Sequence, residues 1–371
     1  MILDILEKRQ KNVFLALILF IVMIPLFSLN SKAQTNQQLY LNRIGFCSLE
    51  VGYDVQVVGD RAYVTNNDGL MIVDIQNPQN PQKIGEILMV GAVGFIVEGD
   101  IAYICSVVSG FVIANISDPA QPELLGQYIN GAGAYRIATS GSHAYVTYFG
   151  AGFKIFNIED PTDPVLLGEF SDTRSDAIQI KDNFVYFGNA EVGLKVINVS
   201  DSSTPQLVTT VSQTGGANDI HITNNLLFLA CWGEGIRVLD ISNPLSPLRL
   251  DSYNDNDGGE ELGLVEKEGF LYVADNYGIE IFNVSNPNSI VEIAERTSDV
   301  SAAHNIDVDD DYIYVAQGGG LLILEVSTTP DDGTPEGDNP DFLLYVIIIS
   351  VVIAVGGISI VLYFKIYRKK T

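Results

Sequence analysis

Residues Gly235–Pro247 read GIRVLDISNPLSP, an alternation of apolar and polar residues that ends in a turn bracketed by two prolines. Alternation with a period of two is typical of a β-strand whose side chains point to both faces of a sheet. Variants of this phrase begin at six other glycines: Gly69, Gly110, Gly152, Gly193, Gly278 and Gly320. An internal repeat of this kind decides the architecture of the chain.

The repeat has a period of about 42 residues, and each unit contains four strand patterns. In the fifth unit these patterns start at Asn218, Leu226, Gly235 and Leu248. No stretch between the two ends of the chain has sustained helical periodicity. Four antiparallel strands at this period are typical of a propeller blade. The sequence therefore predicts an all-β protein, a seven-bladed β-propeller of four-stranded blades.

The two ends of the repeat region complement each other. The last unit stops after its third strand, at Val326, and the region begins with an unmatched strand, LNRIGFC, over Leu41–Cys47. That strand looks like the fourth strand of other units, such as LLGQYIN from Leu124. We therefore expect the N-terminal strand to close the ring by pairing with Gly320–Val326.

The phrase GLxIxDIxNPxxPxxLG resembles the LVIVD-repeat family, surface β-propeller proteins of bacteria and archaea. The resemblance covers Leu41–Val326, and the chain departs from it at Ser202 and Ser289, where turn prolines would be expected. The resemblance implies an exported repeat domain. It implies no particular chemistry, because the functions in the family are largely unassigned, and no site residues carry over from it.

The N-terminus has the layout of a secretory signal peptide. Lys8, Arg9 and Lys11 precede the apolar block Val13–Leu29, and small residues stand at the two positions that define a cut after Ala33. We predict a signal peptide over residues 1–33 and a short leader over 34–40. An uncleaved anchor is the alternative, because the apolar block is close to the shortest length that spans a bilayer.

The C-terminus has the layout of a membrane anchor. Residues 342–364 carry no charge and, as a helix, would reach about 34 Å, enough to cross a bilayer. Residues 365–371 are basic, which favours a cytoplasmic tail. Residues 327–341 are rich in Pro, Gly and Asp and are expected to form a solvated stalk. A propeller over residues 41–326 would then face outward from the cell membrane on one C-terminal transmembrane helix.

The chain is strongly acidic, with a net charge of −26. Between the two terminal segments, residues 34–341 carry 12 basic and 44 acidic residues, a net charge of −32. Such a surface repels phosphate backbones, which excludes nucleic acid as an expected partner. The three cysteines, Cys47, Cys105 and Cys231, fall in different blades, so we expect buried thiols and no disulfide.

The first strand of each blade lines the central channel of a propeller, so its polar positions are the candidate ligand-binding residues. Aligned with one another, these strands alternate variable polar positions with uniformly apolar ones. The candidates at the channel mouth are Asp54, Arg136, Asp176, Asp219, His304 and Asn305. The alternative is a wet channel in which Arg136 pairs with an aspartate. The same alignment places Gln56, His221 and Asp307 two positions further along the channel.

The loops that enter the first strands share a rim with the loops between second and third strands, and both sets vary in sequence. Variable loops on a repeated scaffold are a usual place for function. Asn254–Glu261 is the most acidic of them, and its carboxylates suit Ca²⁺. The candidate metal ligands are Asp255, Asp257, Glu260 and Glu261, although the full spacing of a calcium loop is absent.

No nucleophile elbow, zinc-protease motif, Walker A motif or dinucleotide-binding pattern occurs, so no catalytic residue is assigned. We interpret the chain as a binding or adhesion scaffold at the cell surface, for an extracellular protein or glycan. One alternative is a channel-mouth hydrolase or lyase supported by Ca²⁺, with Asp and His residues as acid and base. A structural spacer of the envelope is a further alternative.

Overall fold

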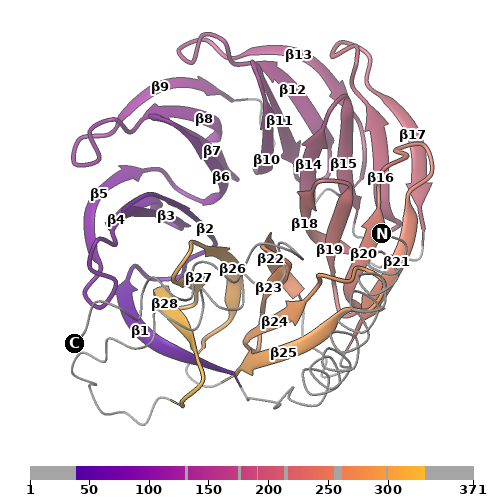
Figure 1. Ribbon diagram of the computed structural model, residues 1–371. Helices are drawn as coiled ribbons and strands as arrows, with labels where there is room; N and C mark the ends of the chain where they lie inside the picture. The colour runs from indigo at the N-terminus through magenta and orange to yellow at the C-terminus, as the bar shows by residue number, and fades with distance from the viewer. Residues whose placement is uncertain are drawn as a thin grey trace, which may run out of the picture. The chain divides into compact units, whose positions relative to one another are not determined.

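The computed structural model describes residues 39–129, 133–173, 177–189, 191–212, 216–254, 261–297 and 300–330. The chain divides into two compact units, Met1–Leu39 and Tyr40–Thr371, and every described strand belongs to the second. In the described ranges, 28 strands form seven four-stranded antiparallel sheets. The sheets surround a common axis as the blades of a propeller (Figure 1). The prediction of an all-β, seven-bladed propeller is confirmed.

Each blade places its four strands in order from the axis outward. Blades 1 to 3 consist of β2 (Asp54–Val58), β3 (Arg61–Asn66), β4 (Gly69–Asp74) and β5 (Gln82–Leu88); β6 (Ala92–Glu98), β7 (Ile101–Ser106), β8 (Gly110–Asn115) and β9 (Glu123–Tyr128); and β10 (Ala134–Ser140), β11 (His143–Tyr148), β12 (Gly152–Asn157) and β13 (Val165–Phe170). Blades 4 and 5 consist of β14 (Ala177–Lys181), β15 (Phe184–Asn189), β16 (Gly193–Asn198) and β17 (Gln206–Val211); and β18 (Ala217–Thr223), β19 (Leu226–Cys231), β20 (Gly235–Asp240) and β21 (Leu248–Tyr253). Blades 6 and 7 consist of β22 (Glu261–Lys267), β23 (Phe270–Asp275), β24 (Ile279–Asn283) and β25 (Val291–Arg296); and β26 (Ala303–Val308), β27 (Ile313–Gln317), β28 (Gly320–Ser327) and β1 (Tyr40–Ser48).

The ring closes in blade 7, where β1 is the outermost strand beside β28 (Figure 1). The two strands pair antiparallel from Tyr40 opposite Ser327 to Ser48 opposite Gly320, with one irregularity between Arg43 and Gly45. The innermost strands then touch in an unbroken series that returns from β26 to β2. The predicted closure by the N-terminal strand is therefore confirmed.

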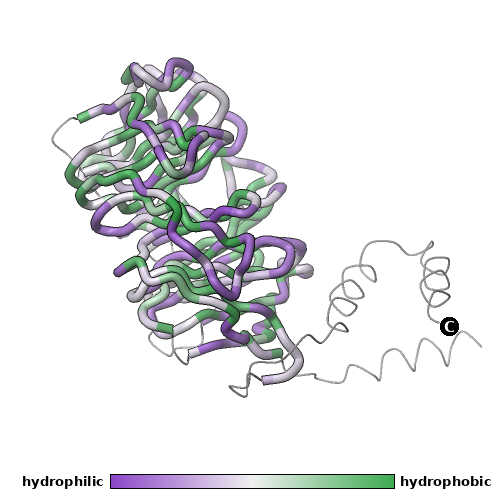
Figure 2. Tube along the Cα trace, turned by 90° about the vertical axis from the view of Figure 1, so that its left-hand side faces the viewer, coloured by the Kyte–Doolittle hydropathy of each residue, from purple (hydrophilic) through white to green (hydrophobic). Residues whose placement is uncertain are grey.

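Two rims hold the connections between strands. One rim carries the connections between the second and third strands of each blade and the connections from the outer strand of one blade to the inner strand of the next. We call it the loop rim. The opposite rim carries the proline-bracketed turns such as Asn243–Pro247, and we call it the turn rim. Figure 2 shows the blades from the side, with hydrophobic strand segments enclosed by hydrophilic connections.

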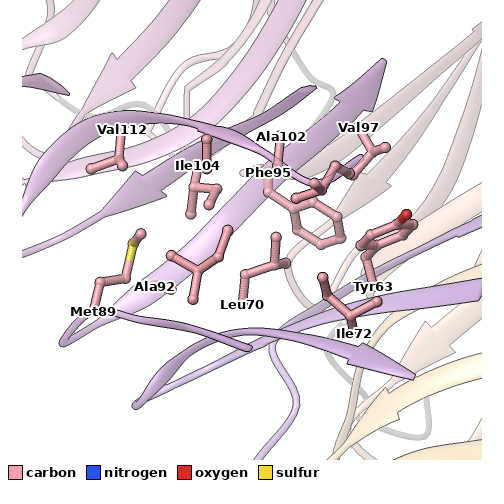
Figure 3. Packing of buried hydrophobic residues seen from close by; sticks show 13 residues of the cluster. Tyr63, Leu70, Ile72, Met89, Ala92, Phe95, Val97, Ala102, Ile104 and Val112 are labelled. Carbon is pink, nitrogen blue, oxygen red and sulfur yellow. The ribbon is translucent and has the colours of Figure 1, made fainter. Parts of the chain in front are cut away.

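The core lies between neighbouring blades. The middle strands β3 and β4 are almost wholly buried, whereas the outer strand β5 is mostly exposed. One cluster joins Tyr63, Leu70 and Ile72 of blade 1 to residues of blade 2. Figure 3 shows these side chains facing the blade 2 residues Phe95, Val97, Ala102, Ile104 and Val112. Each blade thus buries both faces against its neighbours, which a single four-stranded sheet could not do.

The repeated phrase serves the fold. Gly235 has a φ of 77°, and a Cβ there would lie 2.0 Å from the carbonyl oxygen of Tyr253, so only glycine fits at this strand start. At the end of the same strand, Asp240 accepts a hydrogen bond of 2.8 Å from the amide of Ser242. Asn115 and Asn283 accept the equivalent bonds from Ser117 and Ser285. These contacts start the turn, as side-chain oxygens of Asp and Asn commonly do.

A second glycine, in the outer strand, lets the blades pack closely. A Cβ on Gly126 would lie 2.4 Å from the carbonyl oxygen of Pro161, in the proline turn of the next blade. Gly45, Gly85 and Gly168 stand in the same relation to a turn of the neighbouring blade. In blade 5 the position holds Asp251, whose carboxylate accepts a hydrogen bond of 2.8 Å from the amide of Ile290.

The predicted terminal segments lie outside the described residues. This applies to the signal peptide (1–33), most of the leader (34–40), all but the start of the stalk (327–341), the transmembrane helix (342–364) and the basic tail (365–371). Within the part of the chain that the structure describes, no helix is long and apolar enough to cross a membrane. The three cysteines are buried, as expected, and none of them forms a disulfide bond in the described part of the chain.

Candidate functional site

Asp54 is a polar residue at the axis with four donors to its carboxylate. It begins β2 and is 9% exposed. Its Oδ1 accepts hydrogen bonds from the amide of Val55 (2.9 Å) and from Nδ2 of Asn305 (2.5 Å). Its Oδ2 accepts a bond from the amide of Phe95 (3.2 Å) and pairs with Nη1 of Arg136 (3.4 Å). One carboxylate therefore connects blades 7, 1, 2 and 3.

Arg136 lies on β10 in blade 3, and its guanidinium lies 5.4 Å from the centre of the Tyr135 ring. Burial lowers the pKa of Arg136, but the nearby Asp54, Tyr135 and Asp219 outweigh burial and raise it overall. The guanidinium thus remains a cation. Its Nε is buried and has no hydrogen-bond partner among the described residues.

Asp219 supplies a second bridge between blades. It lies on β18, and its Oδ2 accepts a hydrogen bond of 3.0 Å from the amide of Leu264 on β22. Burial raises the pKa of Asp219 to about 6, and Arg136 and two backbone amides offset this only in part. Burial also raises the pKa of Asp54 in spite of its four donors. Both carboxylates are therefore held in an environment that disfavours their charge.

His304 and Asn305 come from β26 in blade 7. Nδ1 of His304 donates to the carbonyl oxygen of Gly52 over 2.9 Å, and its ring meets that of Tyr53 edge-on at 5.6 Å. Burial lowers the pKa of His304, so the neutral ring with its proton on Nδ1 is favoured. Asn305 donates to Asp54 and accepts from the amide of Ile306 (2.7 Å).

Gln56 and Asp307, which the sequence places beside the channel without an assigned role, also join neighbouring blades. Gln56 exchanges two hydrogen bonds with the backbone of Val97, at 3.1 and 2.7 Å. Asp307 accepts a bond of 2.7 Å from the amide of Val57, and burial raises the pKa of Asp307 to about 6. Each of them stands two residues after a mouth residue, and alternate residues of a strand share a face, so the sequence indicates that they also face the channel.

The polar residues at the axis therefore connect inner strands to one another. Side chains of β2, β18 and β26 bond to the backbone of the next blade, which satisfies groups that would otherwise be buried without partners. The structure brings Asp54, Arg136 and Asn305 into direct contact, and Asp219 is near enough to affect the pKa of Arg136. His304 bonds elsewhere, to Gly52.

Several candidates fall outside the description. Asp176 lies outside the described residues, as do Asp255, Asp257 and Glu260 of the acidic loop. Glu261 begins β22, but its side chain is not described. Among the side chains that the structure describes, no group of three or more His, Cys, Asp or Glu residues could hold a metal ion.

The family model of the LVIVD repeat matches the chain seven times. The matches cover residues 52–88, 92–130, 131–172, 174–213, 214–255, 262–296 and 301–329. The chain belongs to the LVIVD-repeat family. Each of the first six LVIVD repeats runs from the start of an inner strand to the end of the outer strand of the same blade. The seventh ends with β28, and β1, which precedes the first match, supplies the missing outer strand.

Solved structures show the same fold at low sequence identity. The β-propeller domain of Cps50 (Swd1) from Myceliophteria thermophila is 12% identical with a TM-score of 0.66, and the match covers 78% of this chain and 100% of that one. The WD40 β-propeller domain of Doa1 is 10% identical with a TM-score of 0.62, covering 78% and 97%. The computationally designed Ika8 protein is 10% identical with a TM-score of 0.58, covering 77% and 100%. No curated protein matches the chain.

The LVIVD phrase and the axial polar residues occupy different strands. The phrase forms the third strand and the turn after it, whereas Asp54, Arg136 and Asp219 lie on first strands. The repeated phrase therefore accounts for the middle of each blade, and the axial polar residues lie outside it.

Proposed function

We propose that this LVIVD-repeat propeller is a binding scaffold, held to the cell membrane by its C-terminal segment and exposing its loop rim to an extracellular protein or glycan. The observation that carries this proposal is the direction of β28. That strand begins at Gly320 on the loop rim and ends at Ser327 on the turn rim, where β1 also begins. An anchor that follows Ser327 would place the turn rim toward the membrane and the loop rim away from it.

The chemistry of the channel also favours binding over catalysis. Both oxygens of Asp54 accept two donors each, so this carboxylate has little capacity left to act as a base. His304 uses Nδ1 to hold Gly52. A hydrolase or lyase at this place would have to give up contacts that join the blades, and we therefore rank it below the scaffold.

Protease treatment of intact cells tests the orientation. Cells that express the full chain with a C-terminal tag should lose the propeller to added protease and keep a short tagged fragment. Mass spectrometry of the mature N-terminus should find Gln34 as the first residue. A propeller that survives the protease until the cells are lysed would refute the outward orientation.

A binding screen tests the scaffold itself. The full-length protein, purified in neutral detergent, should bind at least one member of a panel of glycans and surface proteins, with and without Ca²⁺. Binding that depends on Ca²⁺ would support the acidic loop Asn254–Glu261 as a metal site. Failure to bind any member under either condition would contradict the scaffold proposal.

A further inference from the structure

Large apolar side chains gather on the loop rim over blades 1 to 3. Six of them are between 44% and 69% exposed, and we call them the apolar arc: Leu88, Val90, Val107, Val108, Ile129 and Phe149. Leu88 ends β5, and the other five come from four successive connections, β5–β6, β7–β8, β9–β10 and β11–β12. Contiguous exposed apolar residues on a soluble surface commonly mark an interaction site.

The repeat itself provides an internal control for two of the six residues. It gives none for Val107, Val108 and Phe149, because Val192, Trp232 and Tyr277 are also exposed on the equivalent connections of blades 4 to 6. Leu88 and Ile129 stand at equivalent positions at the end of the outer strand, in blades 1 and 2. The other five blades have exposed polar residues at the same position: Ser48, Ser171, Ser212, Asn254 and Thr297. This position stands opposite the first residue of the third strand in blades 1 and 2, so the fold does not require Leu88 and Ile129 to be apolar.

The backbone beneath the arc is held by hydrogen bonds between neighbouring loops. The amide of Val107 donates to the carbonyl oxygen of Gly91 (2.9 Å), and the hydroxyl of Ser106 donates to that of Val90 (2.8 Å). The amide of Phe149 donates to the carbonyl oxygen of Gly133 (3.0 Å). A surface fixed in advance loses little conformational entropy when a partner binds, which favours affinity.

The charges around the arc indicate the kind of partner. Three lysines and arginines near the loop rim are paired with acids: Lys154 with Glu169, Lys195 with Asp172 and Arg237 with Glu234. Glu50, Asp68 and Glu191 are exposed on the same rim. With the body at −32, a second copy of the chain or an anionic membrane would be repelled, and a cationic partner would be attracted.

The side chains of the arc favour a polypeptide over a glycan. Five of the six are aliphatic and offer no hydrogen bonds to sugar hydroxyls, which would lose their water on contact. Apolar side chains of a protein bury on such a surface without that loss. We propose that the apolar arc docks a basic polypeptide segment, with apolar side chains on the arc and Lys or Arg side chains toward the acidic rim. This inference rests on the scaffold function and names the partner class.

Three fluorescent peptides of equal length test the proposal on the full-length protein in neutral detergent. The first alternates Lys with Val, the second replaces Lys with Glu, and the third replaces Val with Ser. The Lys/Val peptide should bind at least about tenfold more tightly than either of the others. Equal binding of the Lys/Val and Lys/Ser peptides would show attraction by charge alone and would overturn the proposal.

Two triple variants locate the contact. The arc variant V90S/V108S/F149S should weaken binding of the Lys/Val peptide about tenfold or more. The matched variant L124S/L166S/L207S changes exposed apolar residues of outer strands near the turn rim and should bind as the wild type does. Since all six side chains are exposed, both variants should keep the unfolding temperature of the wild type.

The outcomes separate the two proposals. Unchanged binding by a folded arc variant, or an equal loss in both variants, overturns the apolar arc as the docking site. If no peptide binds but the glycan panel does, the arc proposal fails and the scaffold function stands. If neither peptides nor the panel of glycans and surface proteins bind, both fail.

Discussion

Replacement of Gly126 by alanine tests how the blades pack. The added Cβ would lie 2.4 Å from the carbonyl oxygen of Pro161 and 2.9 Å from Cδ of Pro164. Ordinary contact of a Cβ begins at 3.4 Å, so the turn of blade 3 would have to move by about 1 Å. Overpacking of this degree costs about 1–3 kcal/mol of folding free energy. Against this, alanine restricts the unfolded chain and returns about 0.4–1 kcal/mol.

We therefore expect Gly126→Ala to destabilise the propeller by about 1–2 kcal/mol, or a few degrees in unfolding temperature. Gly319→Ala is the matched control. That glycine also lacks a positive φ, and the nearest atom to a Cβ there is the end of the Phe46 ring, at 3.2 Å, which can shift. Thermal and urea unfolding of the purified proteins measures both. If Gly126→Ala is as stable as wild type, the close approach of turn and glycine does not contribute as we argue.

Two further predictions concern the channel and the closure. Burial raises the folded-state pKa of Asp219 to about 6, so the carboxyl group holds its proton more tightly in the folded protein than in the unfolded chain, where its pKa is near 4. The protonated group therefore stabilises the fold fully below pH 4, and this stabilisation is lost as the pH rises through 6. Asp219→Asn should therefore reduce the loss of stability between pH 5 and pH 8, as measured by urea midpoints at both values, and an unchanged pH dependence would count against the assignment. Deletion of Tyr40–Ser48 should leave β28 without its outer partner and expose Leu321 and Ile323, which are now fully buried. The deleted protein should lose its cooperative unfolding transition or associate through the open edge, as gel filtration would show, whereas a stable monomer would contradict the closure.

The architecture could be predicted because it is local and repeated. Strand alternation, turn prolines and the 42-residue period are all visible in the sequence of the units, and seven copies remove the ambiguity of any single one. Closure followed from a missing strand at one end and a spare strand at the other. These features do not depend on the exact distance between any two side chains.

The contacts at the axis could be predicted only in part. The alignment of first strands put Asp54, Arg136 and Asn305 on one ring, and in the structure Arg136 and Asn305 both contact Asp54, the pairing of Arg136 with an aspartate that was the alternative to a ligand site. The sequence did not indicate that Asp54 would bond to the backbone of blade 2. Nor did it indicate that Gln56 and Asp307 would each bond to the backbone of a neighbouring blade. Such bonds depend on how far each blade is rotated about the axis, which one repeat cannot encode alone. The candidate metal loop Asn254–Glu261 and Asp176 remain predictions.

The apolar arc as a whole could not be predicted from the sequence, for a related reason. The loops are recognisable in the sequence as variable, but their exposed apolar residues look the same there as buried ones. Tyr148 and Phe149 are adjacent, yet the first is fully buried and the second is 66% exposed. Only the position of each side chain relative to the next blade separates the two.

The place of β28 in blade 7 has a mechanical consequence. The strand lies between β27 and β1, so it is held by hydrogen bonds along both of its edges. A pull on the chain after Ser327, directed along β28, loads both ladders in shear, and many bonds resist it at once. A strand on the outside of the sheet would instead peel away bond by bond. The spare N-terminal strand thus acts as a clamp on the strand through which any load from the C-terminal end enters the ring.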